Sequence, residues 1–385
     1  MPWKETCAMD QKIRMIGDWL DKEYSITELS EVFGVSRKTV YKWINRYKAD
    51  SGSGLKERSR APWCHPNATP VEIVAHILAV KGRHMRWGPR KVVSWLRHKY
   101  PEQRWPANST TSEILKRHSL VKARKRKRRT PPYTEPFLGC EHPNAVWSAD
   151  FKGQFRMGDG TLCYPLTLTD NYSRYLLGCW GLSRPTYEQT RPQLERAFRE
   201  YGLPWAIRTD NGAPFASVAL GGLSRLAVWL IKLGIKPERI ETGHPEQNGR
   251  HERLHRTLKE SAISPPRKDL AEQQRAFNRF SEEYNFERPH EALGQKTPAS
   301  VYRQSPREYP EKVPTIEYEI DFRVRQVRHN GDIKWKGGRI YVSEALAGEA
   351  IGLKQMDNHY WAIYFSFLPL GILDELNMRI TPLKV

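Results

Sequence analysis

Three acidic side chains lie in segments that suit metal-dependent chemistry. Asp150 is in Trp-Ser-Ala-Asp-Phe-Lys-Gly, Asp210 in Arg-Thr-Asp-Asn-Gly, and Glu252 in Asn-Gly-Arg-His-Glu-Arg. The first two end apolar, strand-like runs, and the third lies early in a basic helical segment. Carboxylate oxygens are ligands that Mg²⁺ prefers, and two ions roughly 3.5–4 Å apart stabilise both the attacking and the leaving oxygen of a phosphodiester. We therefore expect the three acids to converge on two Mg²⁺ ions, with Mn²⁺ as a substitute.

The acids differ in what each indicates when it is taken alone. A carboxylate inside a strand, such as Asp150, is costly unless it is paired or bound to metal. Asp210 begins Asp-Asn-Gly, which is a common turn signal. Glu246 lies in a loop that enters the helix, where an acid is often only a charge at the helix start. We favour Glu252, one turn further in, over Glu246 as the third ligand.

The helix that carries Glu252 also carries cations. Positions 252, 256 and 259 share a helical face, so Arg256 and Lys259 are expected beside a bound DNA backbone. An ordinary surface helix with a Glu–Arg pair four residues apart is the alternative.

Other polar and aromatic residues near these motifs are expected to be structural. Asp170 is interpreted as a turn residue, His244 and Asn248 as helix-entry residues, and His290 as a residue that fixes the last helix and its loop. Trp147 and Phe151 alternate with Asp150 along the strand and are therefore expected in the core.

Alternating and helical patterns predict the elements that position the acids. Three antiparallel strands, a helix, a parallel strand and three further helices are expected at 145–156, 162–169, 175–180, 186–201, 205–209, 223–233, 247–262 and 268–285. This order indicates an α/β core. Beyond residue 310, short strand-like runs separated by Gly and Asn predict a small β-barrel.

The charge of the chain is concentrated in its first third. The net charge is +20, and residues 1–130 hold 29 Lys and Arg against 12 Asp and Glu, a net of +17. A polyanion would therefore bind this part first, and nucleic acid is the leading candidate. A solvated basic surface is the alternative.

Residues 10–50 have a helix-turn-helix pattern. Gly34 interrupts an apolar-periodic run, and Ser36 is placed to cap a new helix that extends to Tyr47. The outer face of this helix offers basic groups for phosphates and base edges: Arg37, Lys38, Lys42 and Arg46. A purely structural helical hairpin is the alternative.

A second helical domain is expected over 71–121. Pro89 suits the first turn of one helix, and Thr110-Thr-Ser-Glu113 suits a capping box that opens another. We interpret this domain as a second helix-turn-helix domain that contacts DNA, although packing alone would also explain it.

A basic run follows the second domain. Seven of the eight residues from 122 to 129 are basic: Lys122, Arg124, Lys125, Arg126, Lys127, Arg128 and Arg129. Repulsion should extend such a run, so we interpret it as a linker that neutralises DNA phosphates. A nuclear-targeting signal and a simple solvated linker are the alternatives.

The five cysteines are widely spaced and contain no Cys-x-x-Cys pair, which favours reduced thiols over a zinc finger or a disulfide framework. No apolar signal core is found at the start, and the most apolar stretch, residues 361–373, is too short to span a bilayer. We expect a cytoplasmic protein with no membrane partner.

The motifs together resemble those of DDE-type insertion-sequence transposases with a retroviral-integrase-like core. The resemblance covers about residues 140–305 and is carried by the three acids, by Thr-Asp-Asn-Gly and Pro-x-x-Asn-Gly-x-x-Glu, and by a later set: Tyr284, Asn285, Arg288, Pro289, His290, Leu293, Thr297 and Pro298. One departure is the longer spacing between Asp210 and Glu252, with the surplus around 221–234.

The resemblance implies a ribonuclease-H-like fold in which Asp150, Asp210 and Glu252 are the metal ligands. It implies a multidomain α+β chain: helix-turn-helix domains at 1–50 and 71–121, linkers at 51–70 and 122–139, an α/β catalytic core at 140–305 and a small β-barrel at 310–385.

The activity implied is that of a bacterial, nucleoid-associated transposase. It would bind inverted repeats at transposon ends, nick DNA, and join the freed 3′-hydroxyls to target duplex as a homodimer or higher oligomer. A structure-selective nuclease and a catalytically silent DNA-binding regulator are the alternatives.

Overall fold

The computed structural model describes residues 7–59, 67–121, 140–217, 219–240 and 249–383. It forms two compact units, Met1–Pro70 and Val71–Val385, which are described separately. The seven basic residues of the run at 122–129 lie outside the described residues, as do His244, Glu246 and Asn248.

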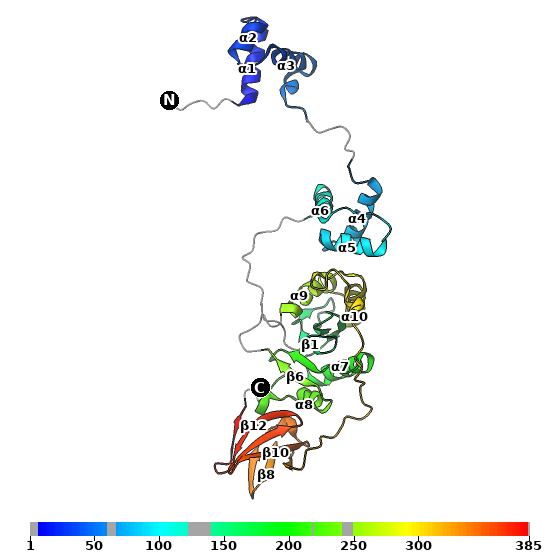
Figure 1. Ribbon diagram of the computed structural model, residues 1–385, viewed down its shortest axis with the longest axis vertical. Coiled ribbons are helices and arrows are strands. Elements are labelled where there is room, and N and C mark those ends of the chain that lie inside the picture. Colours follow the sequence, from blue (N-terminus) through cyan, green and yellow to red (C-terminus); the bar gives the residue numbers. More distant parts are fainter. Residues whose placement is uncertain (1–6, 60–66, 122–139, 218, 241–248, 384–385) are drawn as a thin grey trace. The chain divides into compact units, whose positions relative to one another are not determined.

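The first unit contains three helices, α1 (Ala8–Leu20), α2 (Ile26–Val32) and α3 (Arg37–Asp50) (Figure 1). As predicted, Ser36 caps α3, because its Oγ accepts a hydrogen bond from the Thr39 backbone N–H at 3.2 Å. The helices enclose one hydrophobic core that includes Leu29, Val40 and Trp43.

This unit extends beyond residue 50. Ser51–Leu55 form a short 3₁₀ helix, η1, and Leu55 is buried in the same core. Gly54 lies so close to the backbone of Arg46 that a Cβ atom would collide with it. The first part of the expected linker is therefore packed structure.

The second unit begins with α4 (Val71–Arg83), α5 (Pro89–Lys99) and α6 (Asn108–Arg117), whose core includes Ile77, Val92 and Leu115. Pro89 lies in the first turn of α5, as predicted. The capping box expected at Thr110 is wrong. The N-cap of α6 is Ala107 and not Thr110. Thr111 lies inside the helix, and its Oγ1 donates to the Ala107 carbonyl at 3.1 Å.

A mixed β-sheet forms the centre of the next region. Its strands are β1 (Val146–Phe151), β2 (Phe155–Arg156), β3 (Leu162–Asp170), β4 (Leu176–Leu182), β5 (Ala206–Thr209) and β6 (Lys236–Arg239). The order is β2-β3-β1-β5-β6, with β4 also paired to β3. The pairs β1–β3 and β3–β4 are antiparallel, while β5 and β6 run parallel to β1.

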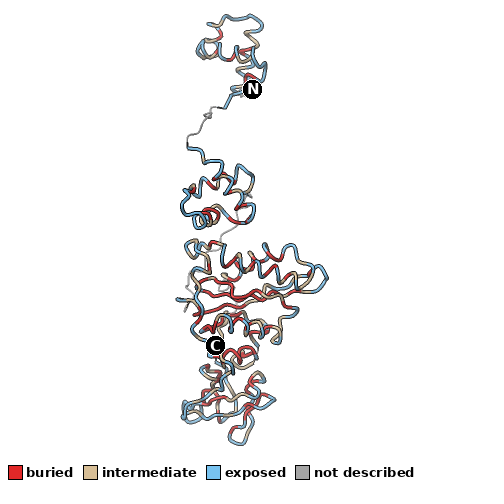
Figure 2. Tube along the Cα trace, turned by 90° about the vertical axis from the view of Figure 1, so that its right-hand side faces the viewer, coloured by how far each residue is buried: buried red, intermediate tan, exposed pale blue. Residues whose placement is uncertain are grey.

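Helices cover both faces of this sheet, and its strands β1, β3, β4 and β5 are largely buried (Figure 2). On one face α7 (Tyr187–Tyr201) and α8 (Arg225–Lys232) pack around Trp147, Phe198 and Trp229. On the other, α9 (Gly249–Leu258) and α10 (Leu270–Glu282) pack around Cys179, Leu258 and Phe277. The result is the three-layer α/β core expected from the sequence.

Short helical segments complete the helices. The π-helical segments η4 (Lys259–Ile263) and η5 (Glu283–Glu287) continue α9 and α10. The 3₁₀ segments lie in connections: η2 (Leu220–Gly222), η6 (Glu291–Leu293), η7 (Pro298–Ser300) and η8 (Glu344–Leu346).

The C-terminal module consists of an open antiparallel sheet and a hairpin. The sheet has the order β13-β12-β11-β10-β7, and β8 pairs only with β9 in the described part of the chain. The bounds are β7 (Phe322–Gln326), β8 (Asp332–Trp335), β9 (Gly338–Tyr341), β10 (Ala350–Asp357), β11 (Tyr360–Phe365), β12 (Leu368–Asp374) and β13 (Arg379–Pro382).

The expected barrel is not confirmed, because β13 and β7 form the two edges of the sheet and do not pair. Helix α8 explains how an open sheet buries its apolar face. Ala227, Val228 and Ile231 belong to the same hydrophobic cluster as Leu353 and Ile363. Leu223 also belongs to this cluster, so part of the region with surplus residues packs with the C-terminal sheet.

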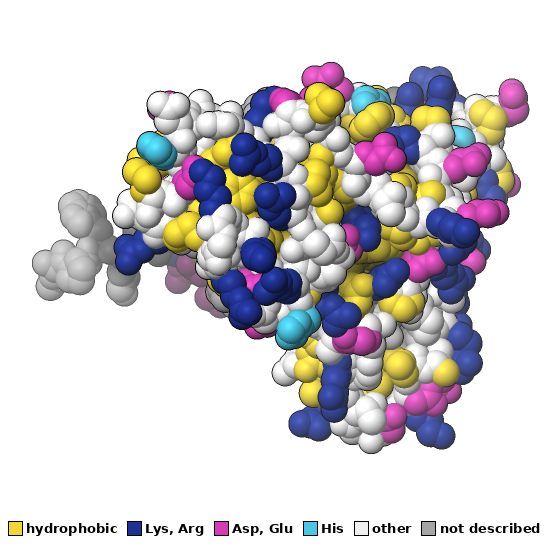
Figure 3. All heavy atoms as spheres, turned by 90° about the horizontal axis from the view of Figure 1, so that it is seen from below, with side chains coloured by type: hydrophobic (Ala, Val, Ile, Leu, Met, Phe, Trp, Pro, Cys, Tyr) yellow, Lys and Arg dark blue, Asp and Glu magenta, His cyan; other side chains and the backbone are white. Residues whose placement is uncertain are grey.

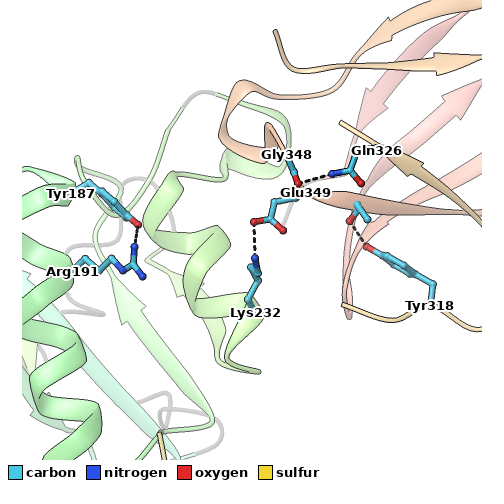
Figure 4. Close-up of polar contacts among 8 residues, drawn as sticks. Tyr187, Arg191, Lys232, Tyr318, Gln326, Gly348 and Glu349 are labelled. Atoms are coloured by element: carbon cyan, nitrogen blue, oxygen red, sulfur yellow. Dashed lines mark hydrogen bonds and ion pairs between the residues drawn. The ribbon is translucent and has the colours of Figure 1, made fainter. Parts of the chain in front are cut away.

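An ion pair borders the junction between α8 and the C-terminal sheet. Lys232 Nζ lies 2.8 Å from Glu349 Oε1 (Figure 4).

Basic and acidic side chains are interspersed on the face seen from below (Figure 3), and residues 310–385 contain ten of each sign. The module therefore lacks the charge excess of the first third. Among the described residues, no helix is long and apolar enough to cross a membrane.

Candidate active site

Strands β1 and β5 bring the two aspartates to the same level of the sheet. Their parallel register pairs Val146 with Ala206 and Ser148 with Arg208. Asp150 is two residues beyond Ser148, and Asp210 is two residues beyond Arg208. Each acid therefore lies two residues past a paired position, and adjacent strands are about 4.8 Å apart. Both are at the carboxyl ends of parallel strands, where α/β folds place their sites.

The side chain of Asp150 lies on the face of the sheet that α9 covers. Its neighbours along β1, Trp147 and Phe151, pack in the core on the opposite face, and Trp147 is completely buried. This confirms the prediction that these two residues are structural. On β3, the residue opposite Asp150 is Thr167, and its hydroxyl contacts α9.

Two histidines of α9 lie against this part of the sheet. Thr167 Oγ1 is 2.8 Å from His251 Nε2 and 2.8 Å from His255 Nε2. His255 Nδ1 is 3.8 Å from Asp150 Oδ2. Burial lowers the pKa of His251 to about 4 and the pKa of His255 to about 2. Both rings are neutral at pH 7, so the contact between His255 and Asp150 is not an ion pair at that pH.

Glu252 lies on α9 between these histidines, but its side chain is exposed. The buried face of the helix consists of His251, Leu254, His255 and Leu258. In the described parts of the chain, no three His, Cys, Asp or Glu side chains are grouped closely enough to hold a metal ion. The fold thus puts Asp150 and Asp210 on or directly after adjacent parallel strands, and Glu252 on the helix whose His255 contacts Asp150. The convergence of all three stays a prediction.

The aspartates are suited to a hard cation. The Asp150 side chain is only 14% exposed and has polar interactions of its own. Asp210 is half-buried, and its Oδ1 accepts a hydrogen bond from the Gly212 N–H at 3.1 Å, as in a turn. This turn bond and a metal role are compatible, because a carboxylate accepts several partners. Carboxylate oxygens from β1, β5 and α9 are the donor set that Mg²⁺ prefers.

Two other polar residues have the structural surroundings that we expected. Asp170 is buried, and it accepts hydrogen bonds from the Ser173 and Asn144 backbone N–H groups at 2.8 and 2.9 Å. The ring of His290 packs edge-on against Tyr284, with 4.7 Å between the centroids.

The basic residues expected to contact DNA differ in their exposure. Arg37, Lys38 and Lys42 of α3 are exposed, whereas Arg46 is half-buried beside the Trp43 ring at 5.0 Å. Arg256 on α9 is exposed. Lys259 is exposed as well, but it begins the π-helical segment η4, where the helical period changes.

None of the sequence motifs points to Thr167, His251 or His255 as a site residue. A signal was present, because His251, Leu254, His255 and Leu258 follow the i, i+3, i+4, i+7 spacing of a buried helical face. That Thr167 faces these histidines depends on strand pairing, which the sequence does not specify directly.

Four protein-family profiles match the chain. Two are described as integrase core domain and match residues 141–245 and 233–298. A helix-turn-helix domain matches residues 11–62, and a homeodomain-like domain matches residues 39–115. The α/β core and the helical domains that precede it therefore define an integrase-type chain with helix-turn-helix domains.

Relatives from insertion elements are similar in sequence. The 39.2 kDa protein of insertion element IS476 from Xanthomonas euvesicatoria is 26% identical over 240 residues, which cover 61% of this chain and 65% of that protein. The 31.7 kDa protein of IS407 from Burkholderia multivorans is 29% identical over 41% of this chain and 54% of that protein. The chain thus spans less than two thirds of either relative.

A viral protein and a solved structure also match part of the chain. The Gag-Pol polyprotein of baboon endogenous virus is 31% identical over 31% of this chain and 6% of that protein. The catalytic core domain of HTLV-2 integrase, solved with magnesium, is 18% identical, has a TM-score of 0.34, and is matched over 42% of this chain and 99% of that chain. We draw no conclusion from structural likeness at this TM-score.

The matches agree with the predicted resemblance to DDE-type insertion-sequence transposases, because the chain is similar to insertion-element proteins and matches helix-turn-helix domains followed by integrase core domains.

Proposed function

We propose that this chain is a DNA transposase. It binds the inverted repeats at transposon ends, nicks DNA to free 3′-hydroxyl groups, and joins these groups to target DNA by phosphoryl transfer. The single observation that supports the proposal is the parallel pairing of β1 with β5, in which Ser148 pairs with Arg208, two residues before Asp150 and Asp210, respectively.

Asp150, Asp210 and Glu252 would hold the metal ions, and Mg²⁺ or Mn²⁺ fits their oxygen donors. When bound, two such ions stabilise the charges on the attacking and leaving oxygens of a phosphodiester. In this proposal the sheet would hold the two aspartates, and α9 would supply Glu252. Arg256 and Lys259 are exposed further along this segment and would contact the DNA backbone.

DNA binding would begin at the N-terminal domains. Most of the positive charge of the chain lies there, including the exposed Arg37, Lys38 and Lys42 of α3 and the basic run at 122–129. Because two transposon ends must be joined to one target, the active form would be a dimer or higher oligomer on DNA. Double-stranded DNA of a bacterial nucleoid would be the partner, which implies a cytoplasmic location.

A strand-transfer assay with a pre-cut oligonucleotide end tests the proposal. We expect joined product that depends on Mg²⁺ or Mn²⁺ and is lost in Asp210→Asn, with DNA affinity retained. Cleavage without joining would indicate a structure-selective nuclease. DNA binding with neither reaction would indicate a DNA-binding regulator. Either result would overturn the proposal.

A second pair of variants tests the third ligand. Glu252→Gln should abolish nicking and joining and leave DNA affinity roughly unchanged, whereas Glu246→Gln should retain both reactions. The opposite pattern would transfer the ligand role to Glu246.

A further inference from the structure

The hydroxyl of Thr167 joins three elements beneath the proposed metal site. Thr167 is completely buried and lies opposite Asp150 in the β1–β3 ladder. Its Oγ1 is 3.1 Å from the Asp150 carbonyl oxygen on β1 and 2.8 Å from Nε2 of both His251 and His255 on α9. A single side chain of β3 therefore connects the strand of Asp150 with the helix of Glu252.

The number of protons fixes the direction of these hydrogen bonds. A threonine hydroxyl has one proton to donate and two lone pairs to accept with. Since a carbonyl oxygen has no proton, the hydroxyl donates to Asp150, and both imidazoles donate their Nε2–H to Thr167. A histidine that carries its proton on Nε2 donates from this atom when it is neutral, and it still does so when a second proton makes the ring charged. Every hydrogen-bonding capacity of Thr167 is therefore in use.

These contacts flank the proposed third ligand. Glu252 directly follows His251 and precedes His255 by three residues, so hydrogen bonds to Thr167 hold α9 on both sides of it. The other ring nitrogen of His255, Nδ1, lies 3.8 Å from Asp150 Oδ2. The ring of His255 thus lies beside the Asp150 carboxylate, while its hydrogen bond to Thr167 holds the helix against the sheet.

We propose that Thr167 is a positioning residue for the metal site, because it fixes α9, and with it Glu252, relative to Asp150. The proposal rests on the proposed function, since it takes Asp150 and Glu252 as metal ligands. Without the Thr167 hydroxyl, two buried N–H groups lose their acceptor, and the helix is free to shift to satisfy them elsewhere. Residues that orient metal ligands typically change metal affinity 10–100-fold when they are replaced.

Thr169 provides a matched control. It is buried two residues further along β3, its hydroxyl contacts the same helix, and a change to valine there replaces the same group. Its Oγ1, however, is 3.5 Å from His251 Nδ1, a long hydrogen bond, and its partner on β1 is Ser148, not Asp150. Thr169→Val therefore measures the general cost of replacing a buried hydroxyl under α9.

The experiment measures Mn²⁺ binding to the full chain without DNA, by the electron paramagnetic resonance signal of free Mn²⁺. We expect Thr167→Val to raise the Kd for Mn²⁺ by about 10–100-fold, and Thr167→Ser and Thr169→Val to stay near the wild-type value. Equal Kd values for wild type and Thr167→Val would overturn the proposal, and so would equal increases in Thr167→Val and Thr169→Val. Circular dichroism establishes that each variant is folded. If Thr167→Val does not fold, Thr167→Ser and Thr167→Ala, which differ by one hydroxyl, give the same comparison.

Asp150→Asn separates this proposal from the proposed function. Loss of Mn²⁺ binding in Asp150→Asn, with normal binding in Thr167→Val, would overturn only the positioning role. Normal binding in Asp150→Asn would overturn the metal site and the positioning role with it. In strand transfer, we expect Thr167→Val to lower kcat and leave the KM for DNA unchanged, because its hydroxyl lies beneath the site and not on the DNA-binding surface.

Discussion

The buried ring of His290 makes the core sensitive to acid. Burial lowers the pKa of His290 from 6.5 to about 3, and the nearby cations Lys91 and Arg288 contribute to the shift. In the unfolded chain this histidine takes up a proton near pH 6.5, whereas in the folded chain it stays neutral. The unfolded state therefore binds more protons between pH 6.5 and 3, and the free energy of unfolding decreases as the pH falls through this range.

The size of the effect follows from the two pKa values. One pKa unit corresponds to about 1.4 kcal/mol. At pH 5 the histidine of the unfolded chain is roughly 1.5 units below its pKa and is protonated, whereas the folded chain is still above its pKa and binds no proton there. His290 should therefore remove about 2 kcal/mol of stability between pH 7 and pH 5. His290→Gln cannot take up this proton, so its stability should decrease by about 2 kcal/mol less over the same interval.

Urea unfolding of the full chain at pH 7 and pH 5, at constant ionic strength, measures the two decreases. Any packing that is lost in His290→Gln is present at both pH values and cancels in the difference. His98→Gln, at an exposed position on α5, controls for the removal of one histidine. Equal decreases in wild type and His290→Gln would refute the reasoning, because His290 would then be protonated within the folded core at pH 5.

Three further predictions concern the packing of the C-terminal sheet, the first unit and the basic run. Ile231→Ala should lower the free energy of unfolding by about 2–5 kcal/mol, because Ile231 is buried between α8 and the C-terminal sheet; a cost below 1 kcal/mol in urea unfolding would contradict this packing. Ser36→Ala should cost the first unit about 1 kcal/mol through loss of the α3 cap, and an unchanged unfolding midpoint of that unit would show that the cap is dispensable. Replacing the basic residues of 122–129 with glutamine should flatten the dependence of log DNA affinity on log salt; an identical slope would mean that the run does not contact phosphate.

Local patterns in the sequence predicted most of the secondary structure correctly. The cap at Ser36, the proline in the first turn of α5 and strand β1, which contains Asp150, depend on residues close together in the chain. The capping box at Thr110 failed for a related reason. Its Ser/Thr-rich segment suits both a helix start and a helix interior, and Thr111 bonds instead to a carbonyl one turn earlier. Strand β6, with its charged Lys-Pro-Glu-Arg sequence, has no apolar alternation and was not predicted.

The sequence alone determined the candidate chemistry of this protein: which acids are available, the motifs around them, and the concentration of positive charge in the first third. Only the tertiary structure decided the parallel alignment of Asp150 with Asp210, the contacts of Thr167 with two histidines of α9, and the open C-terminal sheet packed against α8. The physical reason is that a helix or strand is favoured by neighbours in the chain, whereas strand register and helix docking depend on the burial of surfaces that are distant in sequence.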